Sequence, residues 1–485
     1  MNYSMIFNII GKVVTVEAVF LLPALGIAIG CGERSSLIGF AVAMAVMLVL
    51  GLPLALKRPK RTDIFAREGL AAVGLAWVMV SILGALPFYI SGAIPNYIDC
   101  LFETVSGFTT TGATILTDVE CLPRSILYWR SFTHWLGGMG VLVFLLILNP
   151  LSEKNSGENM HLLRAESPGI KISKLVPRMK RSAGILYMIY IVLTLVEFVL
   201  LVLGKMPVFD AVTLTFGTAG TGGFGVLNNS VASYTPYCQW VITVFMLLFS
   251  VNFNVYFLLL LREVRKALKN EELWAFLLIV LTATLVICIN IAGSYAGTGE
   301  TVRYAAFQVA SIISTTGFST ADFDVWPQLS RMILLLLMFR GACAGSTGGG
   351  LKVVRVLLAV KAAKRAVNKA AHPNSVRLIH MDGEVVGEDT VHSAGMYILI
   401  YFMIMAVAVM ILTLDGLDFE TNFSAVVACL NNVGPGLKMV GPMLNYSCFS
   451  WLSKLVLTFS MRIGRVEIYP ILLLFVPSVW GKVRR

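Results

Sequence analysis

The stretch SGFTTTGATIL, residues 106–116, places hydroxyl side chains and a glycine between two long apolar runs. Lipid offers no hydrogen-bond partner to a hydroxyl or to a free peptide group, so irregular backbone at membrane depth has to face protein or water. The neighbouring runs approach the ~20 apolar residues that cross a bilayer as a helix. The stretch is therefore predicted to line a polar passage within a membrane-embedded chain.

The composition indicates an all-α polytopic membrane protein. Of the 485 residues, 57% are hydrophobic and 13% are charged, and the mean hydropathy is +0.81. The net charge of +11 does not indicate nucleic-acid binding, because Lys and Arg concentrate in alternate connections, which is the positive-inside bias. These basic stretches are 57–67, 151–182, 261–269, 352–377 and the C-terminal KVRR. The bias predicts that both termini are cytoplasmic. For 151–182 and 352–377 two interpretations stay open, a docking surface for an acidic partner or lipid headgroups and a simple topology signal.

One pattern recurs four times along the chain: a long apolar helix, a shorter and less apolar helix, a loop rich in small polar residues, and a second long helix. We call the loops re-entrant loops 1 to 4, and they are TTTGA (109–113), GTGGF (220–224), STTGF (314–318) and NNVGP (431–435). Their glycines are aligned as Gly112, Gly222, Gly317 and Gly434. Self-similarity at comparable spacing indicates four internal repeats.

The repeats define the predicted units of the chain. Two leading transmembrane helices, near 5–30 and 36–56, occupy 1–60, and the pore repeats occupy 61–155, 175–270, 271–372 and 385–485. The predicted short helices lie near 97–109, 207–219, 302–314 and 419–431. The predicted second long helices lie near 123–150, 236–268 and 447–478, and the third repeat ends in a long segment near 327–370.

The re-entrant loops have the chemistry of a cation filter. Each short helix would point its partly negative C-terminal end into the membrane. Glycine accepts backbone angles that let successive carbonyls line one side of a passage, and rings of carbonyl oxygens can replace the hydration shell of an alkali ion. The loops contain no carboxylate, which argues against a Ca²⁺ or Mg²⁺ site.

Several segments resemble the TrkH/KtrB superfamily of potassium transporters. TTTGAT, STTGFST and NNVGPGL resemble its filter sequences, and WRSFTHWLGGMGVLVF (129–144) resembles the second helix of its first repeat. GACAGSTGGGLKVVR (341–355) resembles its intramembrane gating loop, and GRVEIYP (464–470) its G-R-x-E stretch. The resemblance covers essentially the whole chain, and the two leading helices are typical of the TrkH branch.

The resemblance implies an uptake protein of the bacterial inner membrane that moves K⁺ through a gated pore and is not an enzyme. It also implies a homodimer with one pore per subunit and cytoplasmic, TrkA-like nucleotide-binding regulatory subunits. The chain has no G-x-G-x-x-G motif after a strand, so it is expected to hold no organic cofactor. Alternatives are the same fold passing Na⁺ or coupling K⁺ to Na⁺ or H⁺. A membrane scaffold or enzyme is disfavoured because H-E-x-x-H and G-x-S-x-G motifs are absent.

Candidate filter residues follow from the loops and the resemblance. They are Thr110, Thr111, Gly112, Thr221, Gly222, Thr315, Thr316, Gly317, Asn432, Val433 and Gly434. The residues expected to coordinate K⁺ are Thr110, Thr111, Gly220, Thr221, Thr315, Thr316, Asn432 and Val433.

A glycine-rich run, GACAGSTGGG (341–350), interrupts a long apolar segment and is predicted to gate the passage. Each glycine costs ~1 kcal/mol relative to Ala within a helix, so the run is expected to be a loop, with a simple helix kink as the alternative. The candidate gate residues are Gly345, Ser346, Thr347, Gly348, Gly349, Gly350 and Arg465. By the resemblance, Arg465 points into the pore; the alternative is an ion pair with Glu467.

Other polar residues are given structural interpretations. Glu103 and Glu197 are expected to be hydrogen-bonded carboxylates in preference to proton relays, and His134 is expected to pack. Asp118 and Asp322 could either concentrate cations at the mouth or be solvated loop charges. Arg340 is expected either to position the glycine run or to pack elsewhere. Lys352 and Arg355 are interpreted as cytoplasmic anchors, and the scattered cysteines as free thiols.

Overall fold

In the computed structural model, the described residues are 2–57, 59, 66–140, 179–375, 377–466 and 468–480. Within these ranges the regular structure is almost entirely helical. Its strands are β1 (His380–Met381) and β2 (Glu384–Val385), which pair antiparallel as a small hairpin. The predicted all-α class is confirmed.

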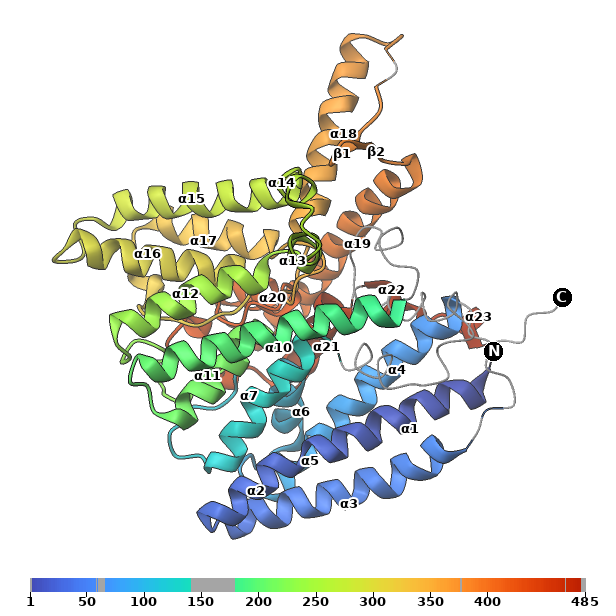
Figure 1. The fold of residues 1–485 in the computed structure, drawn as a ribbon, viewed down its shortest axis with the longest axis vertical. Coiled ribbons are helices and arrows are strands. Elements are labelled where there is room, and N and C mark those ends of the chain that lie inside the picture. The colour runs from blue at the N-terminus through green and yellow to red at the C-terminus, as the bar shows by residue number, and fades with distance from the viewer. Residues whose placement is uncertain are drawn as a thin grey trace.

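The two leading segments form a compact pair along one edge of the molecule (Figure 1). The first is bent into α1 (Tyr3–Phe20) and α2 (Leu22–Cys31), with a proline in the first turn of α2, and the second is α3 (Arg34–Leu56). The helices approach closely because Gly11 faces α3, where a Cβ on Gly11 would overlap the backbone of Leu54 and Ala55.

Repeats 1 and 2 follow the predicted order of elements. Repeat 1 contains α4 (Ala66–Gly84), α5 (Leu86–Ile90), the short pore helix α6 (Tyr97–Phe108) and α7 (Arg124–Gly138). Repeat 2 contains α10 (Met179–Leu203), pore helix α11 (Val208–Gly220), α12 (Pro236–Ser250), α13 (Phe253–Leu260) and α14 (Val264–Leu268). The segment 141–178, with most of the basic stretch 151–182 and the end of the helix predicted at 123–150, lies outside the described residues.

Repeats 3 and 4 repeat the arrangement. Repeat 3 contains α15 (Glu271–Ile291), pore helix α16 (Thr298–Ile313), the 3₁₀ turn η3 (Phe323–Val325), α17 (Gln328–Arg340) and α18 (Val353–Ala371). Repeat 4 contains α19 (Glu388–Leu412), pore helix α20 (Phe419–Leu430), α21 (Trp451–Val466), α22 (Ile468–Leu473) and α23 (Pro477–Trp480), with the 3₁₀ turns η4 (Thr413–Asp415), η5 (Lys438–Val440) and η6 (Tyr446–Cys448).

The helix lengths are those of a multi-pass membrane protein. Among the described residues, six helical segments are long and apolar enough to cross a bilayer. They are Tyr3–Cys31, Arg34–Leu56, Glu68–Ile90, Gly184–Leu203, Glu271–Ile291 and Glu388–Asp415. The bent pair α12 and α13 makes a seventh if it counts as one span.

The prediction of a single helix at 236–268 is wrong. The chain bends by 87° between α12 and α13, because Val251 is extended and the side chain of Asn252 caps α13 by accepting from the Asn254 N–H (2.9 Å). The backbone groups released at this elbow pair with repeat 3: Ser250 O accepts from Cys343 N–H (3.1 Å). The helix predicted at 447–478 is likewise divided, into α21, α22 and α23.

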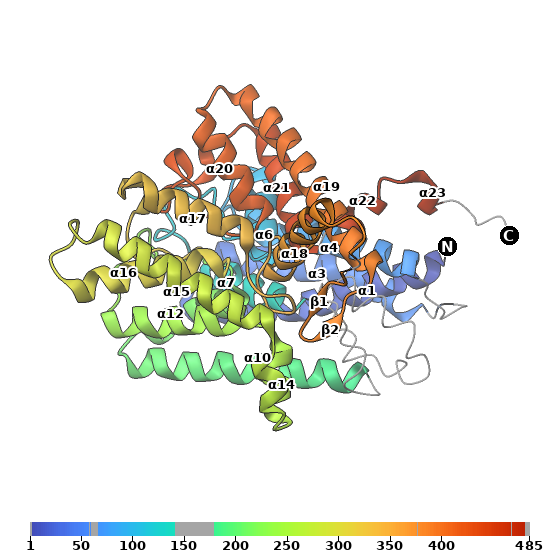
Figure 2. The same cartoon turned by 90° about the horizontal axis from the view of Figure 1, so that it is seen from above.

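The helix contacts close into a ring of four repeats. In each repeat the second long helix packs against its own pore helix and against the next one: α7 on α6 and α11, α12 on α11 and α16, α17 on α16 and α20, and α21 on α20 and α6. Viewed from above, repeat 4 and α10 of repeat 2 lie at opposite edges of this ring (Figure 2). Because the last contact returns to the first repeat, the pore helices surround one axis.

Candidate ion pathway

The re-entrant loops share an unusual backbone conformation. Each has a residue other than glycine at positive φ, followed two positions later by a glycine at positive φ. The first members are Thr110 (55°), Thr221 (55°), Thr315 (60°) and Asn432 (54°), and the glycines are Gly112 (78°), Gly223 (79°), Gly317 (84°) and Gly434 (95°). Residues other than glycine rarely adopt positive φ, so four copies of the same pair identify one repeated structure.

The glycines show that the loops meet. A Cβ placed on Gly112 would collide with the carbonyl oxygen of the middle residue of loop 2, and the same holds from loop 2 to 3, from 3 to 4 and from 4 back to 1. The four oxygens belong to Gly222, Thr316, Val433 and Thr111. The middle carbonyl of each loop therefore lies against the positive-φ glycine of the preceding loop, and because loop 4 contacts loop 1, the four contacts form a closed ring.

The alignment of loop 2 made from the sequence is wrong by one residue. Gly223, and not Gly222, has the positive φ and touches the next loop. Gly222 is small for a different reason, because a Cβ there would overlap the imidazole of His134. Gly220, expected to coordinate an ion, is the last residue of α11, two positions before the carbonyl that joins the ring.

The loop N–H groups turn away from the axis. The middle residue of each loop donates its N–H to a carbonyl near the end of its own pore helix: Thr111 to Ser106 (2.8 Å), Gly222 to Gly217 (2.8 Å), Thr316 to Ser311 (2.9 Å) and Val433 to Ala428 (2.9 Å). Pairs of hydroxyl groups stabilise two of the loops. In loop 1, Thr109 Oγ1 and Thr111 Oγ1 are 2.8 Å apart, and in loop 3, Ser314 Oγ and Thr316 Oγ1 are 2.7 Å apart. The carbonyl oxygens are thereby left for the passage.

A cavity of about 120 Å³ lies at the outer end of the ring. The glycines Gly112, Gly223, Gly317 and Gly434 all line it, together with the segments that return to the surface. Within the described ranges, no group of three or more His, Cys, Asp or Glu side chains is placed to hold a metal ion. No Asp or Glu is among the described residues that line this cavity.

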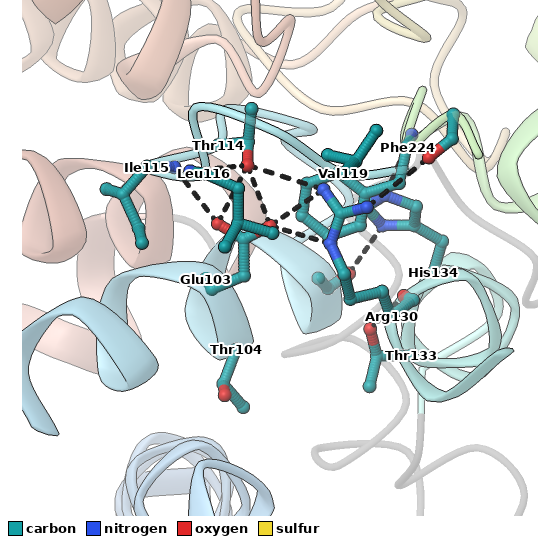
Figure 3. Close-up of polar contacts among 12 residues, drawn as sticks. Glu103, Thr104, Thr114, Ile115, Leu116, Val119, Arg130, Thr133, His134 and Phe224 are labelled. Carbon is teal, nitrogen blue, oxygen red and sulfur yellow. Dashed lines mark hydrogen bonds and ion pairs between the residues drawn. The ribbon is translucent and has the colours of Figure 1, made fainter. Parts of the chain in front are cut away.

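A buried ion pair supports the outer part of loop 1 (Figure 3). Glu103 of α6 accepts from Arg130 Nε (2.8 Å), from Thr114 Oγ1 (2.9 Å) and from the Ile115 N–H (3.1 Å). The interpretation of Glu103 as a hydrogen-bonded structural carboxylate is confirmed. Arg130, which sequence reasoning missed, also places its guanidinium 4.0 Å from the ring centre of Phe224, so it joins repeats 1 and 2.

His134 and Glu197 are both buried. His134 packs its ring 4.2 Å from that of Phe224, and its Nδ1 lies 2.8 Å from Gly107 O while its Nε2 accepts from the Phe224 N–H (3.3 Å). These partners require the neutral Nδ1–H tautomer. His134 therefore packs, as expected, and also fixes loop 2 against α6. Glu197 lies beside Thr218 of α11, but neither of its carboxylate oxygens has a hydrogen-bond partner in the part of the chain that the structure describes, so the expected hydrogen bonding of Glu197 is not observed.

The outer acids belong to loops that shape the mouth. Asp118 accepts from Asn228 Nδ2 (2.8 Å) and from the Glu120 N–H (3.0 Å). These hydrogen bonds, led by that of Asn228, lower the pKa of Asp118, so it is ionised at neutral pH. Asn228 itself lines the outer cavity, which brings this negative charge close to the entrance. Asp322 caps η3 by accepting from the Asp324 N–H (3.0 Å).

The run 341–350 is an irregular loop between α17 and α18, which we call the glycine loop, and it lies against the re-entrant loops. The Gly349 N–H donates to Thr315 Oγ1 (3.0 Å). A Cβ on Gly349 or Gly350 would press on the side chain of Asn432 or Asn431. The prediction of a loop in place of a kinked helix is confirmed.

Arg465 of α21 bridges the glycine loop and α7. Its guanidinium donates to the carbonyls of Thr347, of Gly137 and of Gly138, the last at 2.6 Å. All these acceptors are backbone oxygens. Glu467, the alternative partner considered from the sequence, lies outside the described residues.

The interpretation of Lys352 as a cytoplasmic anchor is wrong. Only 4% of Lys352 is exposed, and its Nζ donates to the carbonyl of Gly348, because the chain turns back at Lys352 with φ of 58°. Arg355 stacks on Tyr397 at 4.0 Å, and Arg340 is exposed at the end of α17. All eight cysteines are free thiols, as expected.

Comparison with known proteins agrees with this geometry. The family model TrkH, described as a cation transport protein, matches residues 37–482. The Trk system potassium uptake protein TrkH of Salmonella typhimurium is 35% identical, over 99% of this chain and 100% of that protein, and the protein of the same name from Escherichia coli K12 is 34% identical with the same coverage. The crystal structure of the potassium transporter TrkH from Vibrio parahaemolyticus superposes with a TM-score of 0.88 at 31% identity, over 99% and 100% of the two chains.

Proposed function

Because the chain belongs to the TrkH family of cation transport proteins, we propose that it takes up K⁺ through the passage formed by its four re-entrant loops. Ions move down their electrochemical gradient, and no covalent chemistry is involved. The observation that carries the proposal is the closed ring of carbonyls from Thr111, Gly222, Thr316 and Val433. Such a ring supplies fixed oxygen ligands to an ion that has lost its water.

The register of the loops supports one assignment of the carbonyls that coordinate the ion. We assign the coordinating layers to the pairs Thr110–Thr111, Thr221–Gly222, Thr315–Thr316 and Asn432–Val433, so Gly222 takes the place of Gly220. All of the N–H groups of the middle residues point back to the pore helices. A cation in the passage therefore meets acceptors and no opposing backbone donors from these residues.

The glycine loop and Arg465 form the gate in this proposal. The loop lies directly against Thr315 and the side chain of Asn432, which is the inner side of the ring, opposite the outer cavity. Arg465 ties the loop to α7 through backbone carbonyls. We assign the described conformation to a closed state, in which the passage below the ring is filled.

The proposed setting is the bacterial inner membrane, with both termini in the cytoplasm. In support, Tyr3 Oη donates to the carbonyl of Trp480 (2.7 Å), so the two described ends of the chain lie on one side. The basic helix α18 projects from the body of the molecule with the β1–β2 hairpin (Figure 1). It offers a surface to TrkA-like nucleotide-binding subunits that would set the state of the gate. A homodimer with one pore per subunit completes the assembly.

The test is ion flux into liposomes that contain the purified protein. Uptake is measured with inward-directed gradients of K⁺, Rb⁺, Na⁺ or Li⁺, with and without a TrkA-like cytoplasmic subunit. The expected result is flux of K⁺ and Rb⁺ well above that of Na⁺ and Li⁺. Equal K⁺ and Na⁺ flux would reject K⁺ selectivity, and flux that requires a Na⁺ or proton gradient would replace simple conduction with coupled transport.

A further inference from the structure

We propose that Glu272, on the first turn of α15, is the positioning residue that holds the glycine loop in its closed conformation. This inference rests on the proposed function of the passage, since it concerns the same gate. Glu272 is 4% exposed and lies outside every motif that identifies the filter or the glycine loop.

One carboxylate oxygen joins the two ends of the loop. Glu272 Oε1 accepts from the Ala344 N–H (2.7 Å) and from the Val354 N–H (3.1 Å). Ala344 lies near the start of the loop and Val354 lies just after it, in the first turn of α18. The first N–H groups of a helix have no partner within the helix, and a carboxylate is favoured at that end. Glu272 therefore caps α18 and ties the base of the loop with the same atom.

The elbow between α12 and α13 contacts both Glu272 and the glycine loop. The side chain of Asn252, between α12 and α13, lies beside the Glu272 carboxylate. The adjoining backbone pairs with the loop, because the Phe253 N–H donates to Gly345 O (3.0 Å). Movement of the loop out of the passage has to break the bonds at Glu272 together with those at the elbow. Glu272 is thus placed to control how readily the glycine loop moves out of the passage.

A path of contacts runs from Glu272 to the cytoplasmic hairpin. The neighbouring Glu271 pairs with Lys361 of α18, and its N–H donates to Asp382 Oδ1 of the hairpin (2.7 Å). Ile379, next to the hairpin, and Met381, within β1, belong to one apolar cluster with Ala344 and Val354. A cytoplasmic partner that shifts the hairpin therefore pulls on the start of α15 and on both flanks of the loop.

The experiment compares three substitutions at this position with a matched control. Glu272→Ala removes the acceptor, Glu272→Met removes it while keeping the side-chain volume, and Glu272→Gln keeps a neutral acceptor. Glu384→Ala, at an exposed position of the hairpin, is the control. Rb⁺ flux into liposomes, without any cytoplasmic subunit, reports the gate. The second readout is the rate at which a small methanethiosulfonate reagent modifies Cys343, a buried thiol of the loop, with the other seven cysteines changed to Ser.

Both rates are expected to rise by about tenfold in Glu272→Ala and Glu272→Met, and by less in Glu272→Gln, because charge-assisted hydrogen bonds are roughly twice as strong as neutral ones. The control is expected to match the unsubstituted protein. A folded Glu272→Met protein with unchanged Cys343 reactivity would overturn the proposal, as would loss of flux with an unreactive thiol. If neither Glu272→Ala nor Glu272→Met folds, Glu272→Gln is the test, and unchanged Cys343 reactivity in that variant would overturn the proposal. Absence of K⁺ or Rb⁺ flux in the unsubstituted protein, both with and without a TrkA-like subunit, would reject the proposed function alone, since the thiol measurement needs no transport.

Discussion

Replacing Gly317 with Ser is expected to reduce the preference of the passage for K⁺ over Na⁺. Gly317 has φ of 84°, and a Cβ at this position would collide with the carbonyl oxygen of Val433 and lie 2.8 Å from Cδ of Pro435. A residue held at a rarely populated backbone angle costs about 1–3 kcal/mol. The obstructing oxygen belongs to the carbonyl ring itself, so relief of the collision has to move a proposed ion ligand.

The magnitude follows from where that strain is relieved. If loop 4 yields, the strain falls on the arrangement that selects K⁺, and about 1.4 kcal/mol corresponds to a factor of ten in a binding ratio. A loss of selectivity between about fivefold and about 150-fold is therefore expected for about 1–3 kcal/mol. The assay is Rb⁺ uptake into liposomes in competition with rising Na⁺, from which the ratio of apparent affinities is obtained.

Gly299→Ser is the matched control, because Gly299 is in the pore helix of the same repeat and a Cβ there would meet no atom within 4 Å. It is expected to keep the selectivity and the thermal stability of the unsubstituted protein. A Gly317→Ser protein that folds, transports and discriminates K⁺ from Na⁺ as before would refute the assignment of loop 3 to the filter. Equal damage from both substitutions would show that a general effect of serine was being measured.

Three further substitutions test separate parts of the pathway. Gly222→Ala should lower the midpoint of thermal unfolding strongly in the unsubstituted background and much less in a His134→Ala background, because its Cβ would overlap the His134 ring; additive losses would contradict this. Arg465→Gln should raise Rb⁺ flux measured without a regulator by several-fold, since one neutral amide cannot bridge the glycine loop and α7; wild-type flux in a folded variant would show that the arginine does not hold the gate. Arg130→Met should destabilise the protein by about 3–5 kcal/mol by leaving a buried carboxylate without its partner, and Glu103→Gln in the same chain should recover much of that loss in chemical denaturation; no recovery would contradict the pairing.

The repeat architecture could be predicted because hydrophobic pattern and loop composition carry it. The four pore helices begin and end within a few residues of the predicted ranges, as in α6, predicted at 97–109 and observed at Tyr97–Phe108. Each such helix is set by its own apolar stretch and by the glycine-containing loop that stops it. The conclusion that four carbonyl segments meet at one axis followed from their repetition and did not need a contact to be known.

What the sequence could not provide are features fixed by a distant partner. The elbow at Val251 and Asn252 has no proline or glycine to announce it, and its released carbonyls are satisfied by a loop about 90 residues later, as in the pair of Cys343 N–H and Ser250 O. The register of loop 2 was ambiguous because T-G-G offers two glycines, and only contact with His134 and with loop 3 tells them apart. Burial of Lys352 was hidden because its acceptor is a backbone carbonyl, which no residue type reveals.

In the proposed gate, the arrangement below the ring adds an electrostatic barrier to the steric one. The carbonyls of the glycine loop are the same kind of ligand that the ring offers to a cation. A run of these carbonyls without hydrogen-bond donors would attract cations. In the described conformation the carbonyl of Thr347 accepts from Arg465 and that of Gly348 from Lys352, while Thr315 Oγ1, which faces the loop, accepts from the Gly349 N–H. Oxygens at the inner side of the ring are thus occupied by donors, two of them on cationic side chains. A K⁺ ion arriving from the ring would have to compete with these donors in a poorly screened environment, where like charges repel strongly. Opening of the proposed gate therefore requires that the glycine loop move away together with its donors, because withdrawal of the backbone alone would leave Lys352 and Arg465 directed at the proposed path of the ion.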